Sequence, residues 1–190
     1  MKIFGMNKLR QYVTDNCAWE LEEIKNKNLF IVQNVLSLEE HVIIFKYTED
    51  GYESLNENLR LSEGKNLSEF GKYLDKTLNK LPDYKGIAYR SVKITDNELQ
   101  KYLKAKENNS ILVEHSFISA SKSKAIANEF GRNCQFTIYS KSGKEIEKFA
   151  KYGLQHPQNE KEILFKPNLQ FEVLEITKQG DKTLIIIEEI

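Results

Sequence analysis

The stretch at residues 159–165, NEKEILF, places two glutamates one residue apart, directly before an apolar run that is typical of a buried strand. Successive side chains of a β-strand point to opposite faces, and each residue rises by about 3.3 Å. We therefore expect Glu160 and Glu162 to share one face, with Cα atoms about 6.6 Å apart, and Ile163 and Phe165 to point into a core. An isolated pair of this kind is usually a solvated strand face, because carboxylates are mostly exposed.

Runs of the same β-type fill the second half of the chain. They are rich in β-branched and aromatic residues and are bounded by turn residues, which is typical of short strands. The runs are GIAYRSV (86–92), ILVEHSFISAS (111–121), CQFTIYS (134–140), EKEILF (160–165), LQFEVLEI (169–176) and TLIIIEE (183–189). One helix, KAIANEF (124–130), is expected to interrupt them.

The first half of the chain has helical signals from about Asp15 to Leu81. Capping-box patterns at residues 37–40 and 66–69 predict two helix starts, Pro82 ends the second helix, and residues 50–51 (DG) predict a turn between them. Helices followed by clustered strands indicate an α+β fold. We expect a single domain over residues 1–190, with a helical layer at about 1–82 and a β-rich core at about 83–190.

The charge composition argues against nonspecific binding to nucleic acid or to an anionic membrane. The chain has 28 Lys and Arg and 28 Asp and Glu, a formal net charge of zero, whereas such binding needs a basic excess. A local basic pocket stays possible. Neither a Sec signal peptide nor a membrane span is expected. We therefore expect the chain to be cytoplasmic in its producer, and leave open secretion or delivery by another route. We also expect a monomer.

Several common catalytic patterns are absent from the sequence. It has no Rossmann glycine pattern, no Walker A loop and no nucleophile elbow. The three histidines are scattered and the two cysteines are far apart, so no metal site is expected. Cys134 opens an apolar alternation and is interpreted as a small core residue.

Two further pieces carry possible chemistry besides the glutamate pair. Arg90 ends an apolar strand, where it must pair with an acidic neighbour or serve an anionic ligand, because burying an unpaired guanidinium is costly. Residues 119–121 (SAS) end a strand directly before a helix. Their hydroxyls either cap that helix or hold a catalytic carboxylate in one rotamer.

In this order and at these separations, the pieces resemble the R-S-E class of mono-ADP-ribosyltransferases, the family of clostridial binary toxins and related single-domain exoenzymes. Arg90 matches the family's arginine, residues 119–121 its Ser-Thr-Ser element with alanine in place of threonine, and residues 160–162 its Glu-x-Glu. Upstream, residues 45–60 resemble the helical segment that carries a Tyr-Thr, an Asn and a Leu-Arg. Four matches in register overturn the solvated-face interpretation of the two glutamates.

The resemblance implies a fold and a reaction. The fold has an N-terminal helical layer over two antiparallel sheets packed as a sandwich, with NAD in the cleft between them. The reaction cleaves the nicotinamide–ribose bond of NAD and transfers ADP-ribose to an arginine of an unidentified target protein. NAD is the substrate, and no metal is needed because nicotinamide leaves as a neutral molecule. The chain would be a toxin or an effector.

The resemblance also implies residue roles. Glu162 would hold the ribose 2′-hydroxyl and stabilise the oxocarbenium-like state, Ser119 would orient Glu162, and Glu160 would activate the acceptor guanidinium. The residues expected at NAD are Arg90, Arg60, Tyr47, Asn56, Phe130 and Arg132. For Phe130, stacking on nicotinamide and a core contact at a helix end stay open. Tyr152, in the loop before the glutamates, is expected to touch the acceptor.

Two alternatives remain at this point. The same residues would serve an NAD glycohydrolase, in which water is the acceptor and Glu160 is dispensable. A non-catalytic NAD-binding or interaction module is the other alternative, and Ala120 in place of threonine is the one departure that favours it.

Overall fold

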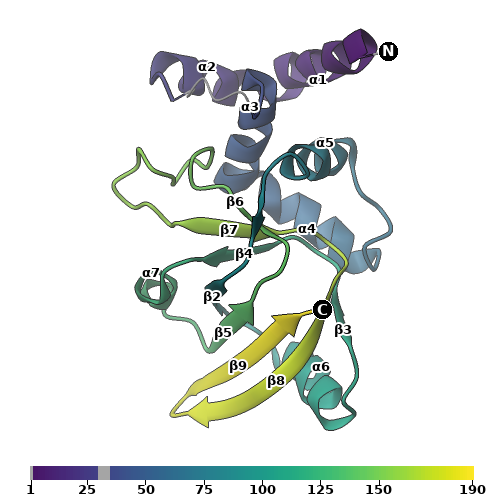
Figure 1. The fold of residues 1–190 in the computed structure, drawn as a ribbon, viewed down its shortest axis with the longest axis vertical. Helices are drawn as coiled ribbons and strands as arrows, with labels where there is room; N and C mark the ends of the chain where they lie inside the picture. The colour runs from purple at the N-terminus through teal and green to yellow at the C-terminus, as the bar shows by residue number, and fades with distance from the viewer. Residues whose placement is uncertain (1, 30–34) are drawn as a thin grey trace. The chain divides into compact units, whose positions relative to one another are not determined.

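The computed structural model describes residues 2–29 and 35–190 (Figure 1). Residues 30–34, which belong to the predicted helical region, lie outside the described residues. The chain divides into two compact units. The first comprises Met1–Pro82 and Ile146–Asn159, and the second comprises Asp83–Glu145 and Glu160–Ile190. Each unit is described by itself.

The first unit is helical, as the sequence predicts for this part of the chain. Its elements are α1 (Lys2–Asn16), α2 (Ala18–Asn26), α3 (Leu38–Lys46), the π-helical turn η1 (Tyr47–Gly51), α4 (Tyr52–Leu61) and α5 (Glu69–Leu78). Helix α3 contacts α1, α2 and α5 and is buried from Glu40 to Phe45. A helix that is apolar on most sides belongs at the centre of a core, so α3 organises this unit.

The predicted capping box at the start of α3 is confirmed. The Ser37 hydroxyl accepts a hydrogen bond from the Glu40 backbone N–H at 3.3 Å, and the Glu40 carboxylate accepts one from the Ser37 N–H at 2.9 Å. Together these bonds satisfy donors that a helix start otherwise leaves unpaired.

Two other predictions in the first unit are wrong. Helix α5 is capped by Ser68, whose hydroxyl accepts from the Gly71 N–H at 3.1 Å, and not by Asn66. The expected turn at residues 50–51 is the end of η1, which continues from α3 into α4. Gly51 suits this path, because a Cβ there would lie 3.0 Å from the Lys46 carbonyl oxygen.

The second unit holds the strands and two helices. They are β1 (Asp83–Tyr84), β2 (Ile87–Val92), α6 (Asp96–Glu107), β3 (Leu112–Glu114), β4 (Ile118–Ser121), α7 (Lys124–Glu129), β5 (Cys134–Tyr139), β6 (Gly143–Glu145), β7 (Glu162–Phe165), β8 (Leu169–Gln179) and β9 (Lys182–Glu189). The α+β class is therefore confirmed. The predicted run at 111–121 is two strands, and β1 and α6 were not predicted.

Helix α6, which was not predicted, begins with a capping box that is visible in the sequence. Thr95 accepts from the Glu98 N–H at 3.2 Å, and the Glu98 carboxylate accepts from the Thr95 N–H at 2.7 Å, which completes a capping box. The helix covers part of the sheet, since Tyr102 packs its ring against Phe136 of β5 with a centroid distance of 5.2 Å.

The expectation of two strictly antiparallel sheets is wrong. The strands form one nine-stranded mixed sheet in the order β1-β6-β7-β4-β2-β5-β9-β8-β3. The β8–β9 hairpin, yellow in Figure 1, places β9 beside β5 in a parallel pair. Only the pair Tyr89–Ser121 joins β4 to β2. The sheet is therefore thinly connected at the point where β2 and β4 meet.

The core of the second unit lies on one face of these strands. Its buried residues include Ile118 and Ala120 of β4 and Ile163 and Phe165 of β7, so the predicted inward direction of Ile163 and Phe165 is confirmed. Cys134 is a buried free thiol in the same cluster, as predicted.

In residues 2–29 and 35–190, no helix is long and apolar enough to cross a bilayer.

Candidate active site

Glu162 is the first residue of β7 and is 5% exposed. The Ser119 hydroxyl, on the neighbouring strand β4, donates a hydrogen bond to Glu162 Oε1. Burial raises the pKa of Glu162 to about 7, and the nearby Glu160 charge adds to the rise, while the Ser119 hydrogen bond and the Arg90 charge oppose it. A buried carboxylate that titrates near neutrality is a common property of catalytic acids and bases.

The register between β4 and β7 explains why Ser119 reaches Glu162. Ser121 lies opposite Glu162, and Ser119 lies opposite Leu164. Because side chains alternate along a strand, Ser119, Ser121 and Glu162 share one face, and the core residues occupy the other. Ser119 and Glu162 are therefore diagonal neighbours across the strand pair.

Glu160 does not share a strand face with Glu162, contrary to the first prediction. Strand β7 begins only at Glu162, and Lys161 has a φ of +50°, in the left-handed region. An L-residue in that conformation interrupts the alternation of a strand. Glu160 thus lies in the irregular segment 159–161 that precedes the strand, where it is half-buried and where burial raises the pKa of its carboxyl group.

The end of β4 holds this segment in place. The Ser121 hydroxyl donates to the Glu160 carbonyl oxygen at 2.7 Å and accepts from the Ser123 N–H at 3.0 Å. The Lys122 N–H donates to the Lys161 carbonyl oxygen at 3.0 Å. Ser121 was not among the predicted site residues, although its two-residue spacing from Ser119 places both hydroxyls on one strand face.

The interpretation of the hydroxyls at residues 119–121 as a helix cap is wrong, because another serine caps the helix. Ser123 is the N-cap of α7, where its hydroxyl accepts from the Ile126 N–H at 3.5 Å. Ser119 bonds to the Glu162 carboxylate instead. Capping and carboxylate orientation are therefore both present, four residues apart.

Arg90 lies in β2 and is half-buried. Its Nη1 donates to the Ser119 carbonyl oxygen at 2.5 Å. Within the described residues Arg90 forms no ion pair, so the alternative of an acidic structural partner is not met. Its remaining N–H groups leave it able to bind an anion. Ser119 thus contacts Arg90 through its carbonyl and Glu162 through its hydroxyl.

Phe130 and Arg132 follow helix α7 in the second unit. Phe130 is 48% exposed, so its interpretation as a core contact is wrong. Arg132 is exposed, and its backbone N–H donates to the Ser91 hydroxyl at 3.3 Å. Gly131, between them, has a φ of +57°, the conformation that commonly ends a helix at glycine.

The other predicted residues belong to the first unit. Asn56 Nδ2 donates to the Tyr47 hydroxyl at 3.2 Å, and both residues are buried. Arg60 is exposed in the last turn of α4. Tyr152 is half-buried and its ring contacts the His156 ring edge-on, with centroids 4.9 Å apart. Their predicted roles at NAD and at the acceptor stay predictions.

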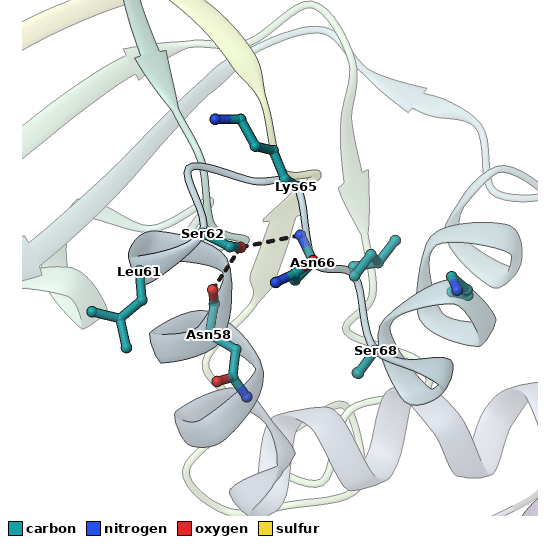
Figure 2. Close-up of a pocket in the computed structure, with 8 residues that line it drawn as sticks. Asn58, Leu61, Ser62, Lys65, Asn66 and Ser68 are labelled. Carbon is teal, nitrogen blue, oxygen red and sulfur yellow. Dashed lines mark hydrogen bonds between the residues drawn. The ribbon is translucent and has the colours of Figure 1, made fainter.

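The first unit also contains an open hollow of about 600 Å³, and several of its lining residues flank Arg60 in the sequence (Figure 2). Figure 2 shows the Ser62 hydroxyl donating to the Asn58 carbonyl oxygen at 2.7 Å and accepting from the Asn66 N–H at 3.1 Å. None of the predicted site residues lines this hollow; its lining residues are Asn58, Leu61, Ser62, Lys65, Asn66, Leu67, Ser68 and Lys72.

The second-unit residues define what the site can do. A buried carboxylate is oriented by a hydroxyl and lies within the electrostatic influence of an arginine. Such a carboxylate, when ionised, stabilises positive charge that develops on a substrate. A second carboxylate, that of Glu160, lies two residues earlier, and a hydrogen bond from Ser121 holds its backbone carbonyl. In the part of the chain that the structure describes, no three His, Cys, Asp or Glu residues are grouped as metal ligands.

Comparison with known proteins identifies the class. The family described as "NAD:arginine ADP-ribosyltransferase" matches residues 5–190. The chain belongs to this family, as the motifs predicted.

Two curated relatives carry the same description. The chain is 26% identical over 162 residues to the putative NAD(+)–arginine ADP-ribosyltransferase Vis of Vibrio splendidus, covering 76% of this chain and 61% of Vis. It is 28% identical over 167 residues to the NAD(+)–protein-arginine ADP-ribosyltransferase Tre1 of Serratia proteamaculans, covering 86% of this chain and 35% of Tre1. The chain therefore spans about three fifths of the length of Vis and about a third of Tre1.

Solved structures agree on the fold. The ADP-ribosyltransferase HopU1 of Pseudomonas syringae superposes with a TM-score of 0.73 at 20% identity, covering 90% of this chain and 85% of HopU1. Vis in complex with agmatine superposes with a TM-score of 0.63 at 23% identity, covering 90% of this chain and 82% of Vis. The fold is thus that of the ADP-ribosyltransferases, with the mixed sheet described above.

Proposed function

We propose that this chain cleaves NAD at the bond between nicotinamide and ribose and transfers ADP-ribose to an arginine of a target protein. The observation that carries the proposal is the Ser119–Glu162 hydrogen bond, with Arg90 bound to the same serine. Family membership and relatives named as arginine ADP-ribosyltransferases support it. The NAD glycohydrolase alternative is not favoured, because no such activity appears in those names.

The proposed first step breaks the glycosidic bond of NAD. The bonding electron pair leaves with the nicotinamide nitrogen, which becomes neutral, and positive charge develops at the ribose carbon. Ionised Glu162 accepts a hydrogen bond from the ribose 2′-hydroxyl and stabilises that charge. Ser119 keeps the carboxylate in the required orientation, and Arg90 binds an NAD phosphate oxygen.

The proposed second step joins the acceptor to the ribose. A guanidinium is a poor nucleophile, because its charge is delocalised and its pKa exceeds about 12. Glu160 holds the charge of the acceptor guanidinium and takes its proton, so that the nitrogen lone pair attacks the ribose carbon. The half-buried setting of Glu160, which raises the pKa of its carboxyl group, favours proton acceptance. An amide at this position would not perform the transfer.

We also propose that the two compact units act as one catalytic domain over residues 1–190. The family description covers residues 5–190 and thus includes both units. The proposed target is a protein with an accessible arginine, in line with the name of Tre1, a protein-arginine ADP-ribosyltransferase.

The test is nicotinamide release from NAD by the purified chain, with and without agmatine as a small guanidino acceptor. We expect agmatine to accelerate release and to form an ADP-ribosyl adduct. Glu162→Gln should abolish both, and Glu160→Gln should leave slow hydrolysis only. Release that ignores agmatine and a guanidino peptide alike would contradict the arginine proposal.

A further inference from the structure

The loop Ile146–Asn159 precedes the two glutamates in sequence and belongs to the same compact unit as the helices. Two contacts link Lys151 of this loop to the π-helical turn η1. The Lys151 backbone N–H donates to the Thr48 hydroxyl at 2.9 Å. The Lys151 ammonium group forms a hydrogen-bonded ion pair with Glu49. Adjacent residues of η1 thus hold the main chain and the side chain of one loop residue.

The ion pair is partly shielded from water. The side chains of Lys151 and Glu49 are 23% and 19% exposed, and the Lys151 ammonium also lies 3.9 Å from Glu23 and 5.8 Å from the centre of the Phe45 ring. Burial lowers the pKa of Lys151, but its bond to Glu49 and the charges of Glu49 and Glu23 outweigh burial and leave the pKa raised. Partly buried pairs of this kind are screened less by salt than surface pairs.

Thr48 is oriented for its part in the contact. Its hydroxyl donates to the Phe45 carbonyl oxygen at 3.0 Å, so a lone pair is left to accept from the Lys151 N–H. The π-helical turn brings Thr48 and Glu49 next to the loop, and such turns occur often at functional sites in proteins. The same turn begins with Tyr47.

A second anchor lies two residues earlier in the loop. Phe149 is 6% exposed and meets the ring of buried His41 edge-on, with centroids 5.4 Å apart. The loop is also closed on itself: the Leu154 N–H donates to the Glu147 carbonyl oxygen at 3.0 Å. Tyr152 therefore follows directly after an anchored residue and inside a closed segment.

We propose that Thr48 and Glu49 are positioning residues for the arginine acceptor, because they hold Lys151 and thereby set the position of Tyr152 in the acceptor loop. This inference rests on the proposed function. It assigns acceptor recognition to contacts made by a helical turn of the first unit. The turn acts on the acceptor through Lys151, and neither Thr48 nor Glu49 touches the substrate.

The test uses the full chain with Glu49→Gln, Thr48→Val and Lys151→Met, and with Asp50→Asn as the matched control. Asp50 lies in the same turn and carries the same charge, but it pairs with Lys46 at 2.8 Å instead of with the loop. The first readout is the rate of cleavage in the loop by trypsin at Lys148 and by chymotrypsin at Tyr152. The second readout is steady-state transfer to an arginine-containing peptide, beside NAD hydrolysis without acceptor.

We call the contacts of Lys151 with Thr48 and Glu49 the tether. We expect loop cleavage to accelerate in the three variants that break it and to stay at the wild-type rate in Asp50→Asn. For the peptide, KM should rise by about tenfold, which corresponds to the loss of roughly one charge-assisted hydrogen bond. Hydrolysis without acceptor should stay within about twofold of wild type. Because Glu49→Gln and Lys151→Met remove one contact, the double variant should lose little more than either single variant.

The cleavage rate reports whether the loop is held by the tether, and the transfer assay reports whether that contact affects the reaction. Unchanged cleavage in all three variants would overturn the tether, whatever the activity. Faster cleavage with unchanged peptide KM would overturn its role in acceptor positioning. A chain that transfers nothing to any guanidino acceptor would sink the proposed function, and with it this positioning role, while the cleavage rates would still report whether the loop is tethered.

Discussion

The hydroxyl of Ser119 donates a hydrogen bond to Oε1 of Glu162 across the β4–β7 strand pair, from a position 43 residues earlier in the chain. The bond joins the second residue of β4 to the first residue of β7, its neighbour in the sheet. It also opposes the rise in the pKa of Glu162 that burial causes. Orientation and ionisation of the carboxylate therefore depend on the same contact.

Replacement of Ser119 should impair both chemical outcomes. Ser119→Ala removes a charge-assisted hydrogen bond worth about 1.5–3 kcal/mol, so NAD hydrolysis and transfer should both fall by about tenfold to a hundredfold. The acidic limb of the pH–rate profile should move to higher pH, because the lost bond lowered the pKa of Glu162. Steady-state rates between pH 5 and 9 check this, with Ser123→Ala as the control that removes only a helix cap. An unmoved limb would refute the orienting role.

The carboxyl group of Glu162 should link activity and stability to pH in opposite directions. With its pKa raised to about 7, the group ionises as the pH rises through 7, so activity should increase over that range. Burial makes ionisation costly in the folded state. The protonated group therefore contributes stability that is complete below the unfolded pKa of about 4.3 and is lost as the pH rises through about 7.

Glu162→Gln should lack this pH dependence and should unfold at a higher temperature than wild type at pH 8. The advantage should be on the order of 3–4 kcal/mol at pH 8 and should shrink to about 1 kcal/mol at pH 5. Thermal unfolding of both proteins without NAD at the two pH values measures it. A Glu162→Gln chain with no added stability at pH 8 would contradict the raised pKa.

Arg90 should control NAD binding, because its guanidinium can donate hydrogen bonds to two partners at once. One N–H of the guanidinium donates to the Ser119 carbonyl oxygen, and others are left to donate to a phosphate, whereas a lysine offers a single point charge. Arg90→Lys should therefore raise KM for NAD by about tenfold or more, with a smaller change in kcat. Lys93→Gln, which removes an exposed positive charge just after β2, serves as the control. Equal KM values in wild type and Arg90→Lys would argue against a phosphate contact.

Ser121 should matter more for transfer than for hydrolysis. Its hydroxyl donates to the Glu160 carbonyl oxygen, and Ser121 is only the strand-register partner of Glu162. Ser121→Ala should therefore loosen the segment that positions Glu160. Transfer to agmatine should fall by about fivefold to tenfold, as expected for one hydrogen bond, and hydrolysis should fall less. Both rates come from one assay of nicotinamide and adduct. A loss that is larger for hydrolysis would assign Ser121 to Glu162 instead.

Local patterns in the sequence predicted much of this protein. Runs rich in β-branched and aromatic residues located β2, β5, β8 and β9 to within a few residues, because strand preference depends largely on nearby residues. The helical first part and the capping box at Ser37 followed from local signals in the same way. The order of Arg90, the serines and the glutamates indicated the family, which the match over residues 5–190 shows.

Only the tertiary structure decided the features that depend on distant pairing. The parallel pairing of β5 with β9 replaced a purely antiparallel arrangement. The left-handed conformation of Lys161 excludes Glu160 from the strand. The β4–β7 register brings one serine hydroxyl to the Glu162 carboxylate and another to the Glu160 backbone. These outcomes could not be read from local periodicity, since each depends on segments brought together from far apart in the chain.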